Sequence, residues 1–93
     1  MKGTRLEAMS DAERAEYERA YAAAALAAEV GERVRAAREA AGLSQRELAR
    51  RMGTSQAAVD RLESGGVGAT LTTLQRVATA LGLEVSIELR RSA

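Results

Sequence analysis

The sequence has 93 residues, of which 14 are basic and 13 acidic, so its formal net charge is +1, and it contains neither cysteine nor histidine. The lack of both residue types removes disulfides, Cys/His zinc sites and Ser-His-Asp triads, so we predict a protein that is no enzyme and holds no metal or cofactor. The chain is charged from its start and has no apolar run near about 18 residues, so we expect a cytoplasmic protein that does not enter a membrane.

Residues 11–41 are predicted to be helical. Ser10 followed by Glu13 has the spacing of a capping box. From Asp11 the chain is rich in Ala, Glu and Arg, and apolar residues recur at helical spacing until Gly42. The pattern predicts one long helix, or two helices with a break near Gly31.

Three shorter helices are predicted to follow, each opened by a hydroxyl side chain and closed by glycine. Ser44 with Glu47 has the spacing of a second capping box. The predicted N-caps are Ser44, Ser55 and Thr70, and the predicted ends are Gly53, Gly65-Gly66 and Gly82. The apolar stripe expected on the last helix consists of Leu71, Leu74, Val77, Ala78 and Leu81.

The pattern changes period after residue 82. Leu83, Val85, Ile87 and Leu89 alternate with polar residues, which is typical of a half-buried strand. A lone strand leaves backbone groups unpaired, so we expect a second copy of the chain to supply an antiparallel partner. A frayed tail or a short fifth helix is the alternative.

The two middle helices are separated by a turn of about three residues, which is the layout of a helix-turn-helix. Ala49 is small enough for the helix crossing, and Gly53 tolerates the positive φ that the turn requires. The residues expected to point into the shared core are Leu48, Met52, Val59 and Leu62. Such a turn presents the second helix to a DNA major groove about 12 Å wide.

Residues 30–82, above all GLSQRELARRMGTSQAAVDRLESG and TLTTLQRVATALG, resemble the phage-repressor-like (Cro/C1, or XRE) helix-turn-helix family. The resemblance implies a mainly α, lambda-repressor-like bundle for 30–82, preceded by a helical arm over 1–29. Residues 83–93 would form a C-terminal dimerisation strand and tail, with Val85, Ile87 and Leu89 in the dimer contact. The family often has an aliphatic residue where this chain has Thr54.

The resemblance also assigns candidate roles to side chains. Arg38 and Glu63 would form a structural ion pair. Phosphates would be contacted at helix N-termini, by Gln45, Ser55 and Thr70. Of the other cations on the second helix, Arg46 is a predicted phosphate contact, whereas Arg50 and Arg51 are expected to be solvated.

Base edges would meet the exposed face at the start of the third helix. Gln56 is suited to adenine and Arg61 to guanine, while Ala57 can contact a thymine methyl group. Asp60 would be repelled by phosphates, so we expect it to orient Arg61 or to accept a hydrogen bond from cytosine.

The long arm and the C-terminal strand are similar to those of HigA-type and HipB-type antitoxins. This likeness implies a homodimer that neutralises a cognate toxin and represses its own operon at a palindromic operator. Residues 4–29 carry an excess of acidic side chains, and Tyr17 and Tyr21 are the candidate toxin-binding residues. The alternatives are an arm packed on its own body, a stand-alone XRE-family regulator without a toxin, and a protein-binding module that has lost DNA recognition.

Overall fold

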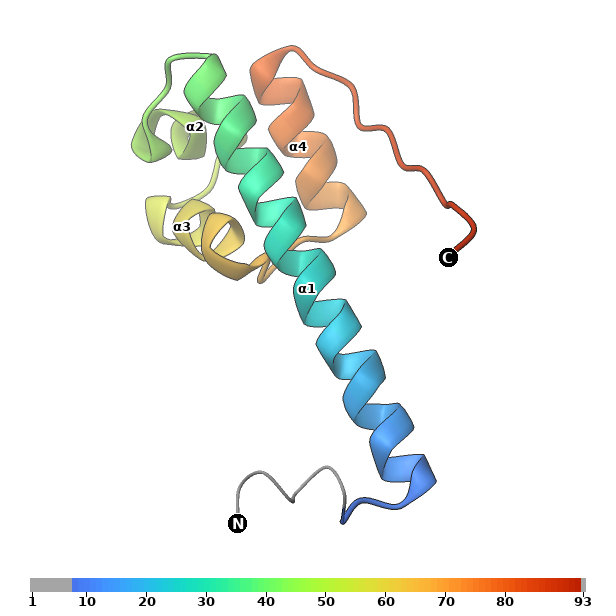
Figure 1. The fold of residues 1–93 in the computed structure, drawn as a ribbon. Helices are drawn as coiled ribbons and strands as arrows, with labels where there is room; N and C mark the ends of the chain where they lie inside the picture. Colours follow the sequence, from blue (N-terminus) through green and yellow to red (C-terminus); the bar gives the residue numbers. More distant parts are fainter. Residues whose placement is uncertain (1–7, 93) are drawn as a thin grey trace.

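The computed structural model describes residues 8–92, so the first seven residues of the predicted arm and the last residue of the tail lie outside it. Within this range the chain forms α1 (Asp11–Ala40), α2 (Gln45–Met52), α3 (Gln56–Gly65) and α4 (Leu71–Leu81). Figure 1 shows α2, α3 and α4 gathered around the C-terminal part of α1, while the N-terminal half of α1 extends away from them. None of these helices is both long enough and apolar enough to cross a membrane.

Helix α1 is continuous over 30 residues, so it has no break at Gly31 and runs across the expected boundary between arm and domain. The predicted capping box is confirmed: Ser10 Oγ accepts from the Glu13 N–H at 3.1 Å, and the Glu13 carboxylate accepts from the Ser10 N–H at 2.9 Å. Gly31 instead lies where α1 crosses α3. A Cβ atom there would be 2.6 Å from the carbonyl oxygens of Leu62 and Glu63. Glycine therefore permits a close helix crossing at this point.

The three shorter helices begin and end as predicted. Ser44, Ser55 and Thr70 each accept a hydrogen bond at 3.1 Å from the backbone N–H three residues later. Gly53, Gly66 and Gly82 end these helices in the left-handed conformation. Only one of the two hydrogen bonds of the second capping box forms, the one from the Glu47 N–H to Ser44. The Glu47 carboxylate instead binds the guanidinium groups of Arg50 and Arg51. Bonds between two charged groups are stronger than a bond to a neutral backbone N–H.

The turn between α2 and α3 is made by Gly53, whose φ is 74°. The N–H of Thr54 then donates to the carbonyl of Ala49 at 2.9 Å, which satisfies the end of α2. The Thr54 side chain is exposed. A polar residue is therefore tolerated at this position of the turn.

The core lies where α1, α2, α3 and α4 meet, and Leu48, Val59 and Leu62 are its most deeply buried side chains. Met52 is only half-buried, although it packs against these residues. The prediction is wrong for one member of the expected apolar stripe on α4, because Leu71 is 69% exposed. It is the first residue of α4, whose buried residues are Val77 and Ala78, further along the helix.

Residues 83–92 leave α4 after Gly82 and form neither helix nor strand, so the described chain lacks the expected strand. Leu83, Val85, Ile87 and Leu89 are all exposed. A strand requires backbone hydrogen bonds to a neighbour, and the described residues of one chain supply none to this segment beyond the Leu83 N–H, which donates to Ala78. Figure 1 shows this segment turning back after α4 and running down the side of α4 that faces away from α2 and α3. Its pairing with a second copy stays a prediction.

We predict that Gly31→Ala lowers the free energy of unfolding by about 2 kcal/mol, because its Cβ would clash with two carbonyl oxygens of α3. Urea denaturation followed by circular dichroism measures this change. Gly65→Ala is the matched control, since nothing lies within 4 Å of a Cβ built at that helical position. Equal stability of the two variants would contradict the close crossing of α1 and α3.

Candidate DNA-binding surface

A buried ion pair connects α1 to the end of α3. Arg38 Nε donates to Glu63 Oε2 at 2.7 Å, and Arg38 Nη2 donates to Glu63 Oε1 at 3.0 Å. The side chains are only 10% and 4% exposed. Arg38 Nη1 also donates to the carbonyl of Leu43 at 2.8 Å, in the link between α1 and α2. Arg38 therefore connects the link between α1 and α2 to the end of α3.

Gln45 extends this network from the first turn of α2. Its side-chain amide donates to Glu63 Oε1 at 3.0 Å and to Asp60 Oδ1 at 3.3 Å. Asp60 thus contacts Gln45 and does not orient Arg61, contrary to one of the two expectations for it. The two donors of the Gln45 amide are both engaged, so its unpaired backbone N–H at the start of α2 is the group that remains for a phosphate.

The environment of Glu63 affects its ionisation in two opposing ways. Burial alone would raise the pKa of this carboxyl group. The hydrogen bonds from Arg38 and Gln45, together with the positive charge of Arg38, outweigh burial and hold the pKa of Glu63 below its ordinary value. The pair is therefore ionised at neutral pH.

Helix α3 has one buried and one exposed face. Val59, Leu62 and Glu63 are buried against the other helices. The opposite face carries the four predicted base-reading residues, which are all exposed: Gln56, Ala57, Asp60 and Arg61. The structure therefore places these four residues together on the accessible side of a helix that α1 and α2 hold in position.

The two other predicted phosphate contacts differ in what their hydroxyl groups already bind. Ser55 Oγ caps α3 by accepting from the Ala58 N–H, and its hydroxyl proton is free to bind an anion. Thr70 Oγ1 caps α4 and also shares a hydrogen bond of 3.0 Å with the hydroxyl of Thr73. Ser55 is therefore the better placed of the two to donate to a phosphate.

The arginines on the four helices fall into two groups. Arg50 and Arg51, for example, both bind Glu47, which leaves them less available to DNA. The others held by carboxylates are Arg19, Arg33, Arg35 and Arg38. Among the described helix residues, three arginines have side chains that form no ion pair or hydrogen bond: Arg46, Arg61 and Arg76. Sequence reasoning missed Arg76, although it is the single charged residue between positions 66 and 82.

Comparison with known proteins is consistent with this arrangement. The family model described as Helix-turn-helix matches residues 34–87, which is more than half of the chain. The chain belongs to the XRE-type helix-turn-helix family. No curated protein matches the chain. Membership of this family makes the protein a sequence-specific DNA-binding regulator, with α2 and α3 as its helix-turn-helix.

We predict that Glu63→Gln lowers the free energy of unfolding at pH 7 by about 3 kcal/mol, because it leaves the buried Arg38 with only the exposed Glu39 carboxylate, 3.9 Å away, as a counter-charge. The folded-state pKa of Glu63 is lowered, so the stability that this carboxylate contributes is complete above its ordinary pKa and is lost as the pH falls below that value. The stability difference between wild type and variant should therefore narrow as the pH falls.

Urea denaturation at a series of pH values measures this difference. Glu32→Gln, at an exposed carboxylate on the same helix as Arg38, is the control and should change stability by less than about 0.5 kcal/mol. A Glu63→Gln effect that is independent of pH would contradict the assigned ion pair.

Proposed function

We propose that the protein is a dimeric antitoxin, which represses its own operon through α3 and neutralises a cognate toxin through the projecting part of α1. The observation that carries the proposal is the surface of this projecting part. From Asp11 to Val30, α1 has no buried side chain. The alternative of an arm packed on its own body finds support only from Ala27 onwards, where the backbone of α1 lies against Gly66 and Val30 packs against the core.

The projecting part of α1 carries large apolar groups in contact with water. Tyr17, Tyr21 and Leu26 are 45%, 69% and 62% exposed. Exposed apolar patches mark sites of protein association, and tyrosine is enriched at such interfaces. We infer that these side chains are covered by the toxin in the complex.

The charge of the arm is consistent with a basic partner. Residues 1–29 contain six acidic and four basic side chains, whereas residues 30–68 contain five acidic and seven basic ones. Opposite charges across an interface accelerate association and select partners. A basic toxin is suited to this surface.

The C-terminal segment supports a dimer. It borders a groove of about 620 Å³ whose apolar lining includes Leu26 and Val30 of α1 and Leu74 of α4. Val85 and Ile87 lie on the other side of this groove and are exposed in the single chain. We infer that two copies pair these segments antiparallel about a twofold axis, which would set two α3 helices about 34 Å apart on a palindrome.

The antitoxin role is tested by expressing the adjacent open reading frame in a bacterial host. We expect growth arrest, relief by wild-type protein, and recovery of a stable complex. Tyr17→Ala with Tyr21→Ala should abolish both relief and complex formation while operator binding remains. No arrest and no complex would indicate a stand-alone regulator, for which the family match over residues 34–87 is sufficient.

The dimer is tested by light scattering. We predict that Ile87→Glu yields a monomer, because it places a charge in the proposed contact, and that deletion of residues 84–93 does the same. Ser86→Glu adds the same charge on the opposite face of an extended segment and should remain dimeric. An unchanged dimer mass for Ile87→Glu would remove this segment from the interface.

A further inference from the structure

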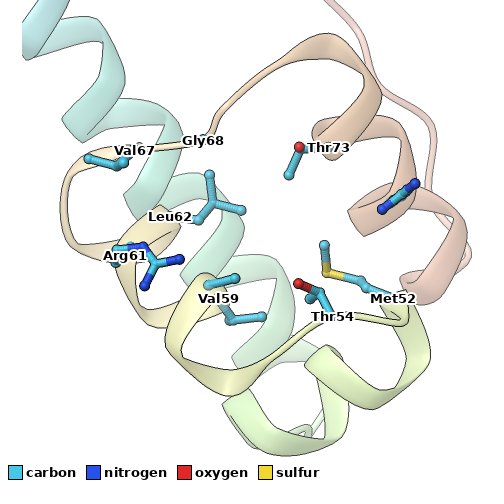
Figure 2. A pocket seen from close by; sticks show the side chains of 10 residues that line it. Met52, Thr54, Val59, Arg61, Leu62, Val67, Gly68 and Thr73 are labelled. Atoms are coloured by element: carbon cyan, nitrogen blue, oxygen red, sulfur yellow. The ribbon is translucent and has the colours of Figure 1, made fainter.

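A small hollow lies between α3 and α4, beside the surface that presents Arg61. Its volume is about 200 Å³, and Val59 and Leu62 form part of its lining (Figure 2). The hydroxyl-bearing residues Thr54 and Thr73 lie on its rim, from the turn before α3 and from α4. Arg61 and Arg76 also line it, so two cations from different helices border one cavity.

Neither of these cations is neutralised by the protein itself. Arg61 and Arg76 are exposed and form no ion pair within residues 8–92, although most helix arginines of this chain are held by carboxylates. No acidic residue occurs between positions 64 and 83, so no nearby side chain on α4 competes for Arg76. The unpaired guanidinium group of Arg76 is therefore suited to a phosphate, while Arg61 keeps its expected role at a base edge.

The size of the hollow indicates which kind of phosphate fits. Sites for complete small molecules usually have volumes of about 300–1,000 Å³. The hollow is smaller, so it accommodates a single anionic group better than a whole nucleotide. A phosphate that belongs to a polymer, with the rest of the chain outside the protein, satisfies this limit.

The position of the hollow indicates where that phosphate comes from. A helix in the major groove lies between two sugar-phosphate strands, and contacts to both strands fix its orientation. Arg46 on α2 is an unpaired cation for one strand. We infer that the hollow between α3 and α4 binds a backbone phosphate of the other strand, with Arg76 as its principal cation. This inference rests on the proposed operator binding.

Fluorescence anisotropy with the DNA upstream of the gene tests the inference. We expect Arg76→Gln to weaken binding about tenfold per protomer, equally on operator and scrambled DNA. The slope of log affinity against log salt should fall by about 1 per protomer. Arg51→Gln removes the same charge from a side chain already bound to Glu47 and should change the slope much less. Arg61→Ala should lose affinity for the operator alone.

Single neutral methylphosphonate linkages in the operator locate the phosphate. One linkage should weaken the binding of wild type but not that of Arg76→Gln. An unchanged affinity and salt slope for Arg76→Gln, with operator specificity still lost in Arg61→Ala, would overturn this inference and leave the proposed DNA binding intact. A third outcome would also overturn the inference: inorganic phosphate binds saturably to wild type and not to Arg76→Gln, while both proteins bind DNA with the same affinity. The hollow would then be a site for a free phosphate ligand. Failure of wild type to bind the operator would overturn both proposals.

Discussion

The contact between Arg38 and Glu63 is the interaction on which the DNA-binding surface depends. It joins α1 to the end of α3, and the same two side chains reach the link after α1 and the start of α2 through Leu43 and Gln45. A buried ion pair is tolerated only when its hydrogen-bonding groups are satisfied. Here the carboxylate of Glu63 accepts three hydrogen bonds, from Arg38 and Gln45, and no buried side-chain polar atom among the described residues lacks a partner. The orientation of α3 is therefore set by polar contacts as well as by apolar packing.

Backbone contacts add a second constraint on α3. Gly31 lies against the carbonyl groups of Leu62 and Glu63, and a Cβ at Gly66 would be 2.3 Å from the carbonyl oxygen of Ala27. Both contacts are at the C-terminal end of α3, next to the ion pair. This end of the helix is thus held by α1, while its first residues remain exposed to solvent. A recognition element benefits from such an arrangement because rigid support lowers the cost of ordering it when it binds.

The helices pair most of their arginines with carboxylates. The pairs involve Arg19, Arg33, Arg35 and Arg38 on α1 and Arg50 and Arg51 on α2, whereas the side chains of Arg46, Arg61 and Arg76 form no pair among the described residues. The net charge of +1 conceals this pattern. Local availability of guanidinium groups, and not overall charge, determines where a polyanion meets this protein, since a paired arginine must break one contact before it makes another.

Features that depend only on neighbouring residues could be predicted from the sequence. The N-caps at Ser10, Ser44, Ser55 and Thr70, the turn at Gly53 and the exposed face of α3 could all be predicted, because capping, positive φ and helical period are local properties. The tertiary structure alone decided that α1 continues through Gly31, that Gln45 binds Asp60, and that Arg76 borders the same hollow as Arg61. These features involve groups 15 or more residues apart, or the crossing of two helices, so only the folded packing specifies them. The exposed segment after Gly82 shows the same limit, since alternation predicts a strand but a strand forms only beside a partner.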